Sequence, residues 1–153
     1  MKKQINSFKV AFQGIWYVIK TESHMRFHIV AACYVVLFGI LFGVSFVEWA
    51  ALSLAIVMVM SCEIINTSIE RLSDLDEKEN NRTIKIVKDA AAGAVLISAV
   101  GSAFVGLFIF MKPEKIAWVF GYFLSNPIAL IILGISIILA ILFIVKGSFN
   151  SKR

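Results

Sequence analysis

The chain has 153 residues, of which 59% are hydrophobic and only 16% are charged. Soluble domains contain about 45–50% apolar and about 25% charged residues, so this composition excludes an ordinary soluble enzyme, a disordered chain and a nucleic-acid-binding module. The net charge is +5, and the basic residues fall in clusters between apolar runs, which is typical of membrane proteins. At about 20 residues for each spanning helix, the length suits one all-α integral membrane domain that crosses the bilayer about four times.

Residues 4–20 predict an amphipathic helix. Apolar side chains recur there with nearly helical spacing, at Ile5, Phe8, Phe12, Ile15, Trp16 and Ile19. Lysines lie around the other side, and Trp16 and Tyr17 are residue types that favour the membrane–water interface. The pattern favours a helix in the headgroup layer, and a helix packed on other protein is the alternative.

Four apolar segments predict membrane-spanning helices, at 27–47, 49–69, 90–111 and 127–145. Gly39 and Gly43 predict close packing of the first span. A stripe of small residues predicts the same for the third span, at Ala90, Ala94, Ser98, Ser102 and Gly106. The fourth span contains no ionisable group.

The connections between these spans differ in length and character. A very short turn near 45–48 joins the first two spans. Residues 71–89 hold most of the charge and predict a solvated segment, with a helix cap at Asn80 or Asn81. Pro113 breaks the chain after the third span, and the aromatic segment 116–126 is expected to lie along the interface.

The basic residues also predict the orientation in the membrane. Thirteen Lys and Arg flank one side of the four spans, in the N-terminal flank, the 71–89 segment and the tail, against two on the other side. Because basic residues favour the cytoplasmic side, we expect both termini and the 71–89 segment in the cytoplasm of a multi-pass plasma-membrane protein.

A row of polar residues marks the cytoplasmic end of the second span. Glu63, Asn66, Thr67 and Glu70 follow helical spacing on one face, and Asp74 extends the row if the helix continues. Polar groups at membrane depth are costly and therefore suggest function. Glu63 lies about one turn deeper than the others, where it could accept a proton from a hydroxyl presented from the lipid side.

Three further residues are expected at the same membrane level. Glu22 precedes the first span, and Lys88 and Asp89 open the third. Two carboxylates with water and phosphate oxygens can hold Mg²⁺, and a nearby lysine can neutralise phosphate charge. Alone, this arrangement suggests phosphoryl transfer. A small proton or cation relay, and a scaffold whose polar face only joins subunits, remain alternatives.

Two motifs resemble those of the small prokaryotic diacylglycerol kinase family, which includes undecaprenol kinases. They are EIINTSIERLSD at 63–74 and KDAAAGAVL at 88–96, and every fixed position of the family pattern is met. ESHMRFH at 22–28 resembles an upstream element of the same family. The resemblance covers about residues 5–111.

The resemblance implies catalytic roles for Glu63, as the general base, and for Asn66. It implies that Glu22 and Glu70 hold the metal together with ATP. For the nucleotide site it implies three more residues: Lys88 on the phosphates, its neighbour Asp89, and Asp74 beside them.

The resemblance further implies a homotrimer whose active sites combine residues of neighbouring chains. The expected chain has a kinase core over 1–111, comprising the surface helix and three spans, followed by an interfacial segment and an extra span over 112–153. The expected activity is Mg²⁺- and ATP-dependent phosphorylation of a membrane lipid alcohol at the cytoplasmic face, with undecaprenol as the first choice and diacylglycerol as the alternative.

Overall fold

The computed structural model describes residues 2–75 and 82–146. Within these ranges all regular structure is helical, and the six helices are α1 (Lys2–Thr21), α2 (Ser23–Phe42), α3 (Phe46–Ser73), α4 (Arg82–Phe110), α5 (Pro113–Ser125) and α6 (Pro127–Lys146). Four of them, α2, α3, α4 and α6, are long and apolar enough to cross a membrane. The expectation of an all-α integral membrane fold with four spans is confirmed.

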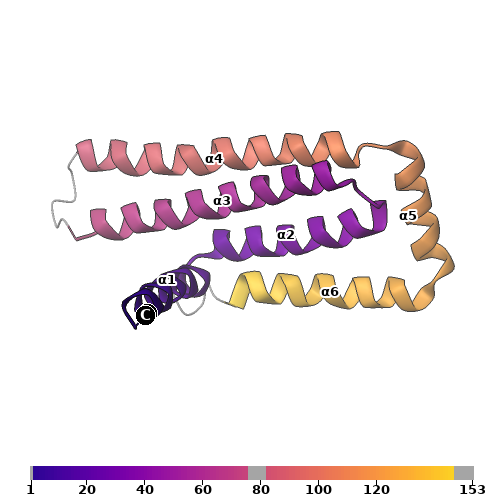
Figure 1. Cartoon of the computed structure of the whole chain (residues 1–153), viewed down its shortest axis with the longest axis horizontal. Helices are drawn as coiled ribbons and strands as arrows, with labels where there is room; N and C mark the ends of the chain where they lie inside the picture. The colour runs from indigo at the N-terminus through magenta and orange to yellow at the C-terminus, as the bar shows by residue number, and fades with distance from the viewer. Residues whose placement is uncertain (1, 76–81, 147–153) are drawn as a thin grey trace.

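The four long helices run alternately up and down, side by side, while α1 and α5 cross opposite ends of this bundle (Figure 1). The start of α2, the end of α3, the start of α4 and the end of α6 therefore share the end that carries α1. This topology brings the polar residues of three helices to one end of the molecule.

The corner between α2 and α3 is set by local caps. Gly43 ends α2 with φ +59°, a left-handed conformation that glycine adopts without strain, and Ser45 and Glu48 form a reciprocal capping box that starts α3. The first span therefore ends five residues before the predicted position, and Gly43 caps the helix instead of packing against a neighbour. Gly39 does pack closely, because a Cβ there would lie 2.6 Å from the indole of Trp49.

The charged segment before the third span is partly helical. α4 begins at Arg82, so the stretch 82–89 is helical and the third span, predicted over 90–111, is the later part of a longer helix. The predicted cap at Asn80 or Asn81 lies outside the described residues. The small-residue stripe packs against α3 at Ser102, whose hydroxyl donates to the carbonyl of Ala55 at 3.1 Å.

The C-terminal part of the chain contacts the bundle at α2 and at the start of α3. Pro113 is in the first turn of α5, so the proline starts a new helix after α4 has ended. α6 packs on α2, where the hydroxyls of Tyr34 and Ser136 lie 3.0 Å apart. Lys112 binds Glu48 at 2.6 Å and links the α4–α5 corner to the start of α3.

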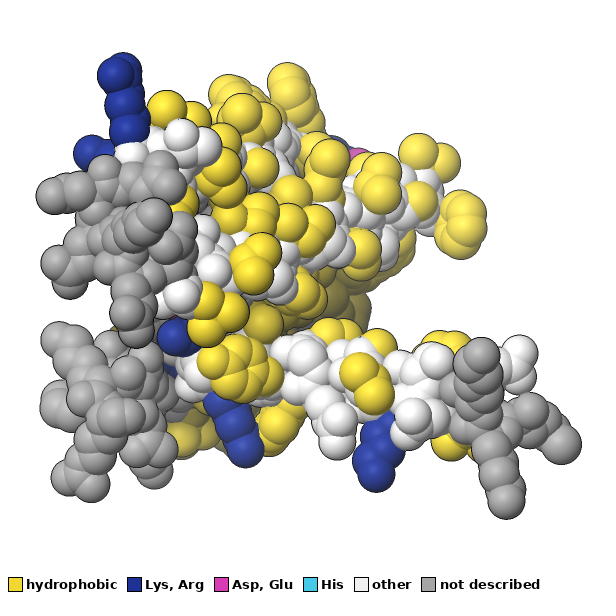
Figure 2. All heavy atoms as spheres, turned by 90° about the vertical axis from the view of Figure 1, so that its left-hand side faces the viewer, with side chains coloured by type: hydrophobic (Ala, Val, Ile, Leu, Met, Phe, Trp, Pro, Cys, Tyr) yellow, Lys and Arg dark blue, Asp and Glu magenta, His cyan; other side chains and the backbone are white. Residues whose placement is uncertain are grey.

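The surface helix α1 keeps its apolar face open. Phe8, Phe12 and Trp16 are each more than half exposed, and the helix contacts the bundle only near its end, where Val18 is buried. Figure 2, which faces this end of the molecule, shows Lys and Arg side chains projecting from it beside largely hydrophobic flanks. An exposed apolar face with flanking lysines favours the headgroup layer as its environment.

Candidate active site

Glu63 is the deepest acidic group at this end of the bundle. Glu63 is only 3% exposed, and the apolar residue Val59, one turn earlier on α3, is also buried. Glu22, His24 and Glu70 lie close enough to interact with its charge. A carboxylate this buried is costly and therefore needs either a partner or a function.

Asn66 and Glu70 lie about one and two turns beyond Glu63 on the same helix face. The Asn66 amide nitrogen donates to Glu70 Oε1 at 3.0 Å, which orients that carboxylate. Asn66 Oδ1 is buried and has no hydrogen-bond partner within the described part of the chain. An unpaired buried acceptor is unusual in a native structure, and it leaves this oxygen free for a ligand.

Glu22 joins the site from a different part of the sequence. It occupies the N-cap position of α2 in extended conformation, and its Oε1 accepts from the Arg71 guanidinium at 3.1 Å. Arg71 also lies over the ring of Tyr17, with its central carbon 5.9 Å from the ring centroid. One arginine of α3 thus fixes the end of α1 and the start of α2 beside the Glu63–Glu70 face.

Asp74 and Lys88 form an ion pair at the rim of the site. Asp74 ends α3 as its C-cap, and Lys88 Nζ donates to its Oδ1 at 2.9 Å. Both side chains are substantially exposed, so the pair contributes little to stability and keeps both charges accessible. Lys88 also interacts with the charge of Glu70. Asp89 is exposed on α4 and takes no part in these contacts.

The structure gives contacts to two arginines, Arg71 and Arg26, for which the sequence predicted no individual role. Arg71 holds Glu22, as described above. Arg26 is 2% exposed and donates to the carbonyls of Ile19, Lys20 and Ile144, so one buried guanidinium closes the C-terminal ends of α1 and α6. The contacts of Arg71 with Glu22 and of Arg26 with Ile144 span 49 and 118 positions, so they leave no periodic signal in a single sequence.

The donor set suits a hard divalent cation completed by a substrate. Among the described residues, no group of three or more His, Cys, Asp or Glu side chains could hold a metal by itself. Glu22 and Glu70 each use one oxygen for the contacts above, which leaves the second oxygen of each, and Asn66 Oδ1 offers a neutral oxygen. Mg²⁺ is commonly bound by one or two carboxylates together with substrate phosphates and water, so these residues fit such an ion.

The arrangement combines three chemical elements at one end of the helices. It has a buried carboxylate that can accept a proton, oxygen ligands nearer the rim, and cationic groups on Arg71 and Lys88 for anionic oxygens. Such a set can bring a phosphate-bearing molecule from the rim to a hydroxyl presented from the membrane.

Comparison with known proteins identifies the family. The profile of the prokaryotic diacylglycerol kinase family matches residues 9–110. An undecaprenol kinase of Bacillus subtilis is 40% identical over 111 residues, covering 72% of this chain and 90% of that protein. A diacylglycerol kinase of Synechocystis is 32% identical over 108 residues, covering 70% of this chain and 62% of that protein, and one of Haemophilus influenzae is 26% identical. No solved structure matches the chain significantly. Because the family match spans well over half of the sequence, this chain belongs to the prokaryotic diacylglycerol kinase family of membrane lipid kinases.

Proposed function

We propose that this lipid kinase transfers the γ-phosphoryl group of ATP to the hydroxyl of undecaprenol, in a Mg²⁺-dependent reaction at the cytoplasmic face of the cell membrane. The observation that carries the proposal is the buried carboxylate of Glu63, with Glu22 and Glu70 beside it and the Asp74–Lys88 pair at the rim. The relative with 40% identity is named for undecaprenol, which supports this acceptor over diacylglycerol.

Glu63 is proposed as the general base. It accepts the proton of the lipid hydroxyl while the hydroxyl oxygen bonds to the γ-phosphorus and the bond from that phosphorus to the bridging oxygen of ADP breaks. The products are the lipid phosphate and ADP, and the proton leaves Glu63 for solvent afterwards. Asn66 orients Glu70 through its amide, and its unpaired oxygen is available to a reactant.

Glu22 and Glu70 would hold Mg²⁺ with the ATP phosphates, and the ion would neutralise charge on the phosphate oxygens. Lys88 is proposed to contact the phosphates directly, since its ammonium is half-exposed and only loosely held by Asp74. Asp74 then positions the lysine, and Asp89 is proposed as its neighbour in the nucleotide site. Residues 76–81 of the 75–87 linker lie outside the described residues.

We further propose the boundaries, orientation and assembly of the protein. The family match ends at residue 110, which supports a kinase core over 1–111 and a separate segment over 112–153. The charge distribution supports cytoplasmic termini and a cytoplasmic active site. A homotrimer follows from the family resemblance, and the open face of α4 at Ala90 and Ala94 is available to a neighbouring chain.

The test is an assay of the purified protein with labelled ATP against undecaprenol, diacylglycerol and ceramide in mixed micelles. Label transfer to undecaprenol in preference to the others supports the proposal. Preferential transfer to diacylglycerol would identify diacylglycerol as the acceptor in place of undecaprenol. A proton or cation relay would consume no ATP, so the absence of transfer to every alcohol, with Mg²⁺ present, would contradict the kinase assignment.

A further inference from the structure

Two apolar cavities lie along the membrane-spanning part of the molecule. The inner cavity, of about 290 Å³, lies between α2, α3 and α4 and is lined by Phe27, His28, Leu52, Val59 and Met60 among others. The outer cavity, of about 510 Å³, lies between α2, the end of α4, α5 and α6. Val35 and Phe110 line both, so the two cavities adjoin each other at these side chains.

The inner cavity begins beside the proposed base. Val59 and Glu63 lie one turn apart on the buried face of α3, and Val59 lines the cavity. His28 lines its near end, and Phe110 marks the point where the inner cavity meets the outer one. A hydrocarbon chain attached to a hydroxyl at Glu63 would therefore enter this cavity first.

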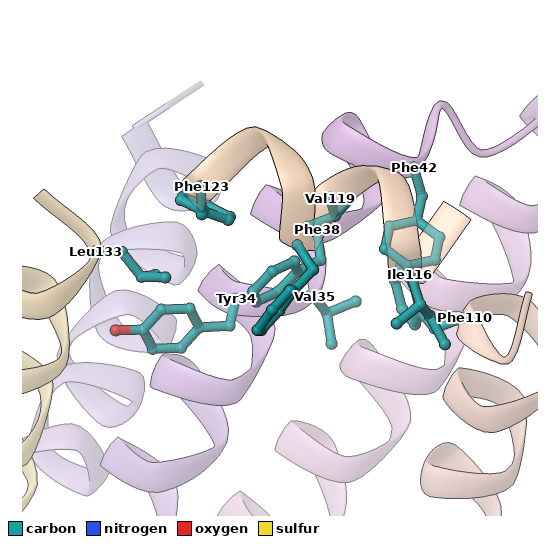
Figure 3. Close-up of a pocket in the computed structure, with 10 residues that line it drawn as sticks. Tyr34, Val35, Phe38, Phe42, Phe110, Ile116, Val119, Phe123 and Leu133 are labelled. Carbon is teal, nitrogen blue, oxygen red and sulfur yellow. The ribbon is translucent and has the colours of Figure 1, made fainter. Parts of the chain in front are cut away.

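Half of the residues that line the outer cavity belong to α5 and α6, the helices beyond the family match. Figure 3 shows Ile116, Val119 and Phe123 facing it from α5, Leu133 from α6 and Tyr34 from α2. The Tyr34 hydroxyl is already paired with Ser136, so the lining offers apolar and aromatic surface and no free charge. Such a surface binds hydrocarbon and discriminates against polar ligands.

The depth of the outer cavity decides which hydrocarbon chain can reach it. On α2, Tyr34 and Phe42 lie roughly 10–20 Å beyond His28 at about 1.5 Å per residue. An acyl chain of the cytoplasmic leaflet ends near the bilayer midplane, about 15 Å into the hydrocarbon core. It would reach only the start of the outer cavity, whereas a long polyprenyl chain continues past the midplane.

We propose that the outer cavity binds the distal part of a long polyprenyl chain and thereby makes the kinase select long polyprenols over short prenols and over diacylglycerol. This inference rests on the proposed function and deepens it. It gives α5 and α6 a role in substrate selection, because they close the cavity without supplying any group to the chemistry.

The first test compares undecaprenol with geranylgeraniol, a short prenol whose chain, like an acyl chain, should reach no farther than the start of the outer cavity. Leu133→Trp, which fills the outer cavity, is expected to raise KM for undecaprenol on the order of tenfold and to leave geranylgeraniol kinetics unchanged. Ile132→Trp is the matched control, because Ile132 is 61% exposed on the outer side of the same helix. If the tryptophan variant does not fold, Leu133→Ala should raise KM for undecaprenol alone by a smaller factor.

Equal losses on both prenols, or no loss on either, would overturn the proposal that the outer cavity binds the distal polyprenyl chain, while leaving the proposed kinase activity intact.

A second measurement does not need catalysis. An undecaprenol analogue with a photoreactive group at its terminal isoprene should label peptides of α5 and α6. Label found only on the lipid-exposed faces of α5 and α6 would contradict the proposal. Absence of label because a second copy of the chain covers the outer cavity would contradict it as well. Wild-type protein that binds the analogue at α5 and α6 but phosphorylates no alcohol would refute the proposed function and support the cavity.

Discussion

Replacing Arg26 tests how the surface helix and the last span are held together. The guanidinium of Arg26 is buried, and it donates to carbonyls near the ends of α1 and α6 at 2.9, 3.0 and 3.2 Å. Both helix ends carry partial negative charge, so the cation stabilises them electrostatically as well. Methionine has a similar length and fits an apolar site, so Arg26→Met removes the charge and the bonds without leaving a large cavity.

The expected cost follows from these three bonds. Hydrogen bonds within membrane proteins contribute about 0.6 kcal/mol on average, and bonds to charged groups about 1.5–3 kcal/mol. At about 1 kcal/mol each, Arg26→Met should destabilise the protein by roughly 2–3 kcal/mol, after allowing for its buried Nη2, which has no hydrogen-bond partner among the described residues. For a chain of this size that corresponds to a Tm lower by roughly 5–10 °C.

Thermal unfolding of the detergent-solubilised protein, followed by circular dichroism, measures this shift. Arg82→Met is the control, since Arg82 is an exposed arginine at the start of α4 and its loss should leave Tm unchanged. An Arg26→Met protein that melts with the wild type would show that these carbonyl contacts do not hold α1 and α6.

Four further predictions address the chemistry and the topology. Glu63→Gln keeps the buried shape but cannot accept a proton, so kcat should fall at least about 10²-fold with little change in KM for ATP; near-normal turnover would remove Glu63 from the role of base. Glu22→Ala and Glu70→Ala should each raise the Mg²⁺ concentration needed for half-maximal activity, and the double variant should lose much less than the combined single effects predict, because the two share one ion; additive losses would indicate separate sites. A chain ending after Met111 should retain measurable kinase activity, provided that it inserts and assembles, because α6 carries no ionisable group between 127 and 145; complete loss in an inserted, assembled chain would place an essential group after residue 111. A cysteine at Ser151, outside the described residues, should react with an impermeant thiol reagent only in inverted membranes, and labelling of intact cells would contradict the four-span orientation.

The spans could be predicted because their signal is local and strong. Uninterrupted apolar runs identify α2, α3, α4 and α6, and the row of polar residues on α3 could be placed on one face by helical spacing. The continuation of α3 to Ser73 confirms that Asp74 belongs at the end of that row. Depth in the membrane and helix periodicity are both properties of consecutive residues, and a single sequence contains them.

Other features depend on conformation or on distant partners. Gly43 has the same local sequence signature as a packing glycine, and only its left-handed backbone identifies it as a cap. The charged stretch 82–89 lies before the predicted span, yet it forms the start of α4, because hydropathy reports the boundary of the membrane and not the end of the helix. The contact between Glu22 and Arg71 spans 49 positions, and no periodicity links them.

The last span illustrates how a segment can influence a reaction without contributing to its chemistry. Residues 127–145 of α6 contain no ionisable group, yet the helix contacts the rest of the protein at three levels. Its end lies on Arg26, its middle pairs with Tyr34 through Ser136, and its first turns close the outer cavity together with α5. Arg26 also holds α1, which ends beside Glu22. A change in the packing of α6 can therefore affect the proposed metal ligands through the Arg26 guanidinium. It can also affect substrate binding through the outer cavity. These two effects are separable. Loss of the Arg26 contacts should lower the stability of the protein whichever substrate is used, whereas a change in the cavity should alter only the selection among prenols.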